Sequence, residues 1–180
     1  MASSLLNVIK GTGKVKHAVG NLAGWNFSTI NQGAIVEGAD IDNFTLVELG
    51  FNADGDRVCK QLSDKTKPAY LIASVERVFE FGVFTESLSD FFNAIGERAR
   101  IVVLERGKHF DSSAYSLNAG VVTPTKGMVA HFDVATKKFI ISASATPHAD
   151  YATSSVKLLV VEVENAPMID GLQTIRFEIQ

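Results

Sequence analysis

Cysteine is almost missing from this chain of 180 residues, in which Cys59 stands alone. A single cysteine forms no intrachain disulfide and no cysteine zinc cluster, so a disulfide-stapled secreted scaffold is excluded and a reducing compartment fits. No apolar run is long enough to span a bilayer. The N-terminus, MASSLLNVIKG, lacks the charged and long apolar regions of a secretory signal. We therefore expect a soluble protein with no membrane partner.

Positive charge is also sparse. The formal net charge is -3, from 17 lysines and arginines against 20 acidic residues, and the basic residues are scattered singly. Binding to DNA or RNA needs a basic stripe or patch that neutralises phosphates, so we predict no nucleic-acid partner. What the chain does have is 46% hydrophobic and 21% charged residues. This composition is typical of one globular domain with a sizeable core.

Glycine is concentrated near the start of the chain, where Trp25 and Phe27 are the large aromatic residues. Such spacing weakens both helices and strands. We predict that residues 1–35 form a glycine-rich arm or lead-in and that residues 36–180 form a single β-rich domain. Two interpretations of Trp25 and Phe27 stay open: they anchor an interface with another subunit, because large aromatics dominate interface energetics, or they dock on the core of their own domain.

Alternating apolar residues predict strands along most of the remaining chain. Residues 44–51 and 57–62 flank the turn cluster Asn-Ala-Asp-Gly-Asp and so predict a hairpin, in which Gly55 supplies a positive φ. A second hairpin is predicted over residues 127–142. The remaining strands are predicted at residues 69–81, 99–105, 155–163 and 172–179.

One segment has helical rather than strand periodicity. Leu88, Phe91, Phe92 and Ile95 recur at i, i+3, i+4 and i+7, and Gly96 follows them. We predict a helix over about residues 86–95 with these four side chains inside. The predicted class is therefore α+β and mainly β: about seven to nine strands in a mixed or antiparallel sheet or sandwich, with one amphipathic helix packed on it.

The search for chemistry yields two short patterns. His131 with Asp133, and His148 with Asp150, each place an imidazole and a carboxylate on one face of an extended segment. They are half a metal site, two halves of one, or ordinary structural and surface residues. The chain contains no G-x-S-x-G, H-E-x-x-H or C-x-x-C motif. We assign no catalytic, cofactor or metal residues and predict no enzymatic activity, with a metal-dependent hydrolase or ligand-binding domain as the alternative.

Three stretches, residues 46–78, 91–105 and 127–152, resemble virion proteins of tailed bacteriophages. The resemblance is greatest to head decoration, or cement, proteins. It implies a non-enzymatic protein that binds the major capsid protein on the outer surface of the head and stabilises it, located in the virion and assembled in the host cytoplasm. Binding to further copies of itself stays open. The rival within the same class is a tail tube or head-tail connector subunit.

Overall fold

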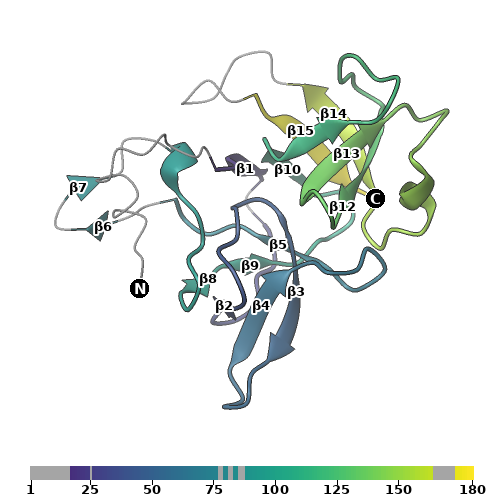
Figure 1. Cartoon of the computed structure of the whole chain (residues 1–180). Helices are drawn as coiled ribbons and strands as arrows, with labels where there is room; N and C mark the ends of the chain where they lie inside the picture. The colour runs from purple at the N-terminus through teal and green to yellow at the C-terminus, as the bar shows by residue number, and fades with distance from the viewer. Residues whose placement is uncertain (1–16, 25, 77–78, 81–82, 85–87, 164–172) are drawn as a thin grey trace.

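The structure is a computed structural model that describes residues 17–24, 26–76, 79–80, 83–84, 88–163 and 173–180. Within these residues the chain is mainly β and forms two mixed sheets and a small two-stranded one (Figure 1). The first sheet has the order β1 (Gly20–Ala23), β10 (His109–Ser112), β15 (Ile175–Ile179), β14 (Leu158–Val163), β12 (Val129–Asp133), β13 (Lys138–Ser142) and β11 (Tyr115–Leu117).

The second sheet has the order β8 (Arg98–Ala99), β2 (Ala34–Val36), β4 (Arg57–Gln61), β3 (Leu46–Phe51), β5 (Tyr70–Ile72) and β9 (Ile101–Val102). The small sheet pairs β6 (Phe79–Glu80) with β7 (Val83–Phe84). Each large sheet owes its mixed character to a parallel pair, β11 with β13 in the first and β2 with β4 in the second. The other pairs within the two sheets are antiparallel.

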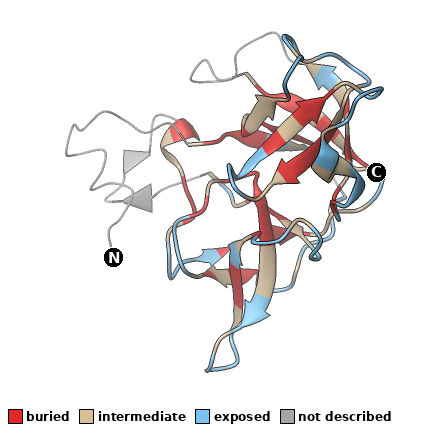
Figure 2. Cartoon of the chain, turned by 45° about the vertical axis from the view of Figure 1, so that its right-hand side comes forward, coloured by how far each residue is buried: buried red, intermediate tan, exposed pale blue. Residues whose placement is uncertain are grey.

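Side chains of the second sheet divide between two hydrophobic cores. Leu46 and Leu71 lie in a large core that both sheets share, whereas Val47 and Ile72, the next residues along β3 and β5, lie in a smaller one. Successive side chains of a strand point to opposite faces, so the sheet is buried on both faces at these positions. Figure 2 shows the buried segments gathered where the strands pack together.

Phenylalanines of the first sheet fill the middle of the large core. The ring of Phe139 lies 5.1 Å from that of Phe177, 5.2 Å from that of Phe132 and 5.5 Å from that of Phe110, measured between centroids. These rings are tilted or edge-on, as the quadrupole of an aromatic ring favours. The packing holds β10, β12, β13 and β15 in one layer.

Both predicted hairpins are confirmed. β3 pairs with β4 through the turn at residues 52–56, where Gly55 has a φ of +83° and the side chain of Asn52 accepts hydrogen bonds from the backbone N–H groups of Asp54 and Asp56. β12 and β13 form the second hairpin as an antiparallel pair. The last two predicted strands form the antiparallel pair β14 and β15.

The predicted helix over residues 86–95 is wrong. In its described part, only the short 3₁₀ turn η1 (Leu88–Asp90) is helical. Asn93 instead forms an antiparallel bridge with Ile41, in which each backbone N–H donates to the other carbonyl oxygen. The buried Asn93 side chain also donates to the Ile41 carbonyl. These long-range bonds replace the local ones that a helix needs, and they leave Ile95 52% exposed while Phe92 stays buried.

The fold class is accordingly corrected from α+β to mainly β. The helical elements of the described residues are 3₁₀ turns, η1 and η2 (Ala149–Ala152). The described strands also outnumber the predicted seven to nine, because β1, β10 and β11 form outside the predicted strands and because some predicted strands break into short ones. Residues 99–105, for example, contribute to β8 and β9 on either side of Arg100, whose carbonyl accepts from the N–H of Ala73 instead of continuing one ladder.

Part of the predicted N-terminal arm lies in the first sheet. β1 pairs antiparallel with β10 at the sheet edge, and Val19 just before it is fully buried. Gly20 approaches closely: a Cβ atom at this position would lie 2.2 Å from the carbonyl oxygen of Asp111 and 2.5 Å from the Phe44 ring. The separation of residues 1–35 from residues 36–180 as arm and domain stays a prediction.

The described part of the chain contains no helix with the length and apolar character needed to cross a bilayer.

Candidate metal centre

His131 lies in the middle of β12, a strand paired on both sides, with β13 and β14. Its neighbours Ala130 and Phe132 belong to the large core. Side chains alternate along a strand, so the imidazole of His131 lies on the opposite face of the first sheet. There it is 1% exposed, beneath the segment that carries η2.

His148 and Asp150 reach the same face from that segment. The backbone N–H of His148 donates to the hydroxyl of Ser142 at the end of β13, over 3.2 Å, which folds the chain back over the sheet. His148 then caps η2, because its Nδ1 accepts from the N–H of Asp150 at 3.2 Å. The rings of His148 and His131 stack with centroids 5.0 Å apart and planes inclined by 22°.

The two imidazoles and the Asp150 carboxylate thus converge. One ligand atom from each lies within 4.8 Å of the others. Among the described residues, neither ring nitrogen of His131 has a hydrogen-bond partner. Buried polar groups are nearly always paired, so this imidazole calls for an explanation.

A lysine from the second sheet completes the surroundings. The ammonium of Lys65, in the loop between β4 and β5, donates to Oδ1 of Asp150. The Lys65 carbonyl accepts from the N–H of Ser155 at 2.7 Å, and the Ser155 hydroxyl donates to the Lys67 carbonyl. The cluster therefore lies where the segment over the first sheet meets a loop of the second.

Electrostatics favour the ligand-competent forms of His131 and Asp150. Burial lowers the pKa of His131, and repulsion from His148 lowers it further, so the ring is held neutral near pH 7. The hydrogen bond from Lys65 lowers the pKa of Asp150 and holds its carboxylate ionised. Neutral imidazole and ionised carboxylate are the states that bind metal ions.

Asp133, the fourth residue of the two predicted pairs, lies elsewhere. Its carboxylate accepts from the N–H groups of Ala135 and Thr136 and from the Thr136 hydroxyl in the β12–β13 turn. The structure thus gathers three of the four residues: the predicted pair His148 and Asp150 stays together, and His131 joins this pair instead of Asp133. Asp133 serves as a turn acceptor.

The predicted interface residues have different outcomes. Trp25 lies outside the described residues. Phe27 is partly buried and packs against the large core, with the Lys108 ammonium 5.8 Å from its ring centroid. Its predicted role as an anchor for another subunit is untested.

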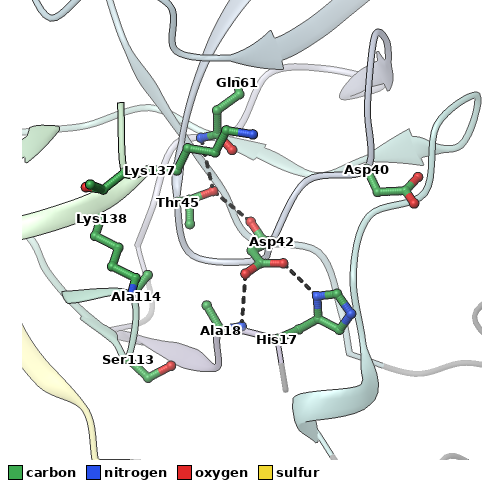
Figure 3. Close-up of a pocket in the computed structure, with 11 residues that line it drawn as sticks. His17, Ala18, Asp40, Asp42, Thr45, Gln61, Ser113, Ala114, Lys137 and Lys138 are labelled. Atoms are coloured by element: carbon green, nitrogen blue, oxygen red, sulfur yellow. Dashed lines mark hydrogen bonds and ion pairs between the residues drawn. The ribbon is translucent and has the colours of Figure 1, made fainter. Parts of the chain in front are cut away.

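A polar pocket of about 380 Å³, which no sequence motif predicts, lies between the sheets (Figure 3). His17 and Asp42 face each other there, with His17 Nδ1 2.7 Å from Asp42 Oδ1. The N–H of Ala18 donates to the other carboxylate oxygen. Asp42 therefore fixes the chain that leads into β1. A separation of 25 positions gives no motif by which sequence could have found this pair.

The end of the β3–β4 hairpin carries an exposed aromatic residue that sequence analysis also missed. Phe51 is 69% exposed and lies opposite Arg57 in the ladder, whose guanidinium carbon is 5.6 Å from the ring centroid. The hairpin extends away from the rest of the molecule in Figure 1. Its alternating pattern predicted the strands and gave no sign that they would project.

Comparisons with known proteins identify the origin of the chain. The family model of the YonC prophage protein matches residues 13–180. The chain belongs to the YonC prophage protein family. It is 48% identical over 181 aligned positions to the SPbeta prophage-derived uncharacterized protein YonC of Bacillus subtilis (strain 168), covering 99% of this chain and 98% of that protein. No solved structure matches.

Membership of the YonC family confirms the coarser part of the predicted resemblance: the chain is a phage-derived protein. The matched region, residues 13–180, contains His131, His148 and Asp150 and the whole β3–β4 hairpin. The virion role, the capsid partner and the absence of enzymatic activity stay predictions.

Proposed function

We propose that this YonC-family chain is a phage structural protein that attaches to the outer surface of the assembled head, as decoration or cement proteins do. Its prophage family and mainly β fold support the proposal. So does the resemblance of residues 46–78, 91–105 and 127–152 to virion proteins of tailed phages. Its partner in this role is the major capsid protein.

The observation that carries the proposal is the exposed aromatic residue on the projecting hairpin. Phenylalanine with 69% exposure leaves apolar surface in water, and burying a ring of this size contributes about 1.5–3 kcal/mol. Arginine is enriched at interface hot spots, and aromatic residues are enriched in interface cores. Phe51 and Arg57 therefore offer a compact anchor that a partner surface can cover without any movement of the two sheets.

The test is co-sedimentation of the purified protein with expanded phage heads stripped of accessory proteins. Light scattering in the same buffer gives the free mass. We expect saturable binding at a fixed copy number per head. If no binding to the heads is detected at a high concentration of the protein, the proposal is refuted. Rings or tubes of the free protein would then favour the tail tube or connector.

A further inference from the structure

From the donor cluster we infer that His131, His148 and Asp150 bind one divalent transition-metal ion of the zinc type, which cross-links β12 to the segment containing η2. This inference does not depend on attachment to the phage head. Two imidazole nitrogens and a carboxylate oxygen form a donor set that suits Zn²⁺ and its neighbours rather than Mg²⁺ or Ca²⁺, which prefer oxygen ligands.

The buried imidazole of His131, which has no hydrogen-bond partner among the described residues, supports a bound ion independently of the donor set. A buried polar group without a hydrogen bond destabilises a fold, because it has lost its bonds to water and gained none in exchange. In the described residues both nitrogens of His131 lack a hydrogen-bond partner, and one of them lies within 4.8 Å of a ligand atom of His148 and of a carboxylate oxygen of Asp150. A metal ion held at the edges of the two rings, in line with their in-plane lone pairs, would bind one nitrogen of each.

The geometry allows closure on an ion. Metal–ligand distances of about 2.0–2.2 Å put tetrahedral ligand atoms about 3.3 Å apart, compared with separations of up to 4.8 Å here. His131 is fixed in a strand, but the side chains of His148 and Asp150 are 38% and 40% exposed and lie on the overlying segment. Rotation of these two side chains closes the difference.

Lys65 keeps one carboxylate oxygen available. Its ammonium binds Oδ1 of Asp150, while Oδ2 faces the histidines, 3.8 Å from Nδ1 of His148. The lysine thus orients the carboxylate, in the way that groups behind a metal ligand usually do. Three protein ligands leave a tetrahedral ion with one further position, on the solvent side, for water or a group from a partner.

The experiment measures Zn²⁺ bound per chain after equilibrium dialysis of the full-length protein, by elemental analysis, with Co²⁺ absorption as a probe of coordination. We expect one ion per chain and the intense visible bands of tetrahedral Co²⁺. His148→Ala and Asp150→Asn change half-exposed side chains, so both should fold, and each should weaken Zn²⁺ binding at least about tenfold.

His109→Ala is the matched control. His109 also lies beside a carboxylate, with Nε2 2.9 Å from Glu178, but outside the cluster. We expect the wild-type stoichiometry in this variant. Fewer than half an ion bound per folded wild-type chain at millimolar Zn²⁺ would overturn the inference. Equal loss of binding in His109→Ala, or unchanged binding in both His148→Ala and Asp150→Asn, would overturn it too.

Discussion

Glu76 is a partly buried carboxylic acid whose Oε1 accepts a hydrogen bond from the amide of Asn43 over 3.1 Å. Asn43 is itself fully buried, and it also donates to the carbonyl of Ser74 and accepts from the N–H of the same residue. Burial raises the pKa of Glu76 to about 7, against the opposing effect of the Asn43 hydrogen bond. The side chain therefore keeps its proton to a higher pH in the folded protein than in the unfolded chain.

The pH dependence of stability follows from this raised pKa. Between the ordinary pKa of 4.5 and about 7 the folded state binds more protons than the unfolded state. The contribution of Glu76 is complete below pH 4.5 and is lost as the pH rises through 7. Glu76→Gln does not titrate, so the variant should not show this loss. Its free energy of unfolding relative to that of the wild type should rise by on the order of 2 kcal/mol between pH 4.5 and pH 8.

Denaturant unfolding of wild type and Glu76→Gln at both pH values measures that difference, and the other titrating groups cancel in it. A stability difference between the two proteins that stays constant from pH 4.5 to pH 8 would show that Glu76 has the same pKa in both states.

His131 gives a second prediction at the scale of one residue. His131→Phe keeps a ring that stacks on His148 and removes two buried nitrogens that lack partners in the described residues. Replacing an unpaired polar group by an apolar one of similar shape is neutral or stabilising. In the presence of a chelator we expect the variant to be as stable as wild type, or more stable by about 1 kcal/mol.

Chemical denaturation with EDTA measures the effect. A loss of more than about 2 kcal/mol would mean that the imidazole makes stabilising interactions of its own. Added Zn²⁺ should raise the melting temperature of the wild type and leave His131→Phe unchanged, since an ion that binds the folded state stabilises it.

Among the elements, the segment from η1 to β8 contains apolar residues that a helix and the observed bridged segment would bury differently. Phe92 is buried, with its ring 4.8 Å from that of His17, whereas Ile95 is half exposed. Phe92→Ala should destabilise the protein by about 3–5 kcal/mol. Ile95→Ala should change the free energy of unfolding by no more than about 0.5 kcal/mol. A helix with both residues on its buried face would give a large loss for each variant, and urea unfolding distinguishes the two cases.

The attachment of β1 to β10 gives a prediction for the described part of the N-terminal segment. Gly20→Ala forces a methyl group against the Asp111 carbonyl and the Phe44 ring, so we expect a loss of about 1–3 kcal/mol. Gly50→Ala, in β3, is the control, because its Cβ would meet Val58 at an ordinary 3.7 Å. Thermal unfolding should separate the two variants. Equal melting temperatures would mean that β1 is not held against the body in solution.

Local signals explain which elements the sequence could predict. Asn52 and Gly55 fix the β3–β4 turn through bonds and a backbone conformation within five residues, so the hairpin was predictable. The predicted helix does not form because Asn93 makes a backbone bridge with Ile41, 52 positions away, in place of the local hydrogen bonds of a helix. Such distant partners leave no trace in a local pattern.

The same reasoning applies to the candidate metal centre. His131 and His148 were predictable as residue types that bind metal. Their convergence depends on the fold of residues 143–148 over the sheet and on Lys65, which comes from the other sheet. The spacing wrongly favoured Asp133 as a partner of His131. Side chains two positions apart on a strand share a face, but the Asp133 carboxylate accepts a hydrogen bond from Thr136 in the hairpin turn instead.

At the scale of the whole molecule, two sheets share one large core while the β3–β4 hairpin extends beyond it (Figures 1 and 2). The exposed end of the hairpin lies on strands whose bases are buried, so it is displayed by a rigid support. This arrangement suits a protein whose proposed work is surface contact. Removal of the exposed ring should therefore affect attachment without affecting the fold.

The affinity of Phe51→Ala for stripped, expanded phage heads is the most direct measurement of the proposed role, with Val122→Ala as control because Val122 is 91% exposed in another loop. We expect Phe51→Ala to melt within a few degrees of wild type and to bind the heads at least about tenfold more weakly, as a hot-spot residue does. Val122→Ala should bind like wild type. Unchanged binding by Phe51→Ala, or equal weakening in both variants, would contradict docking through the hairpin.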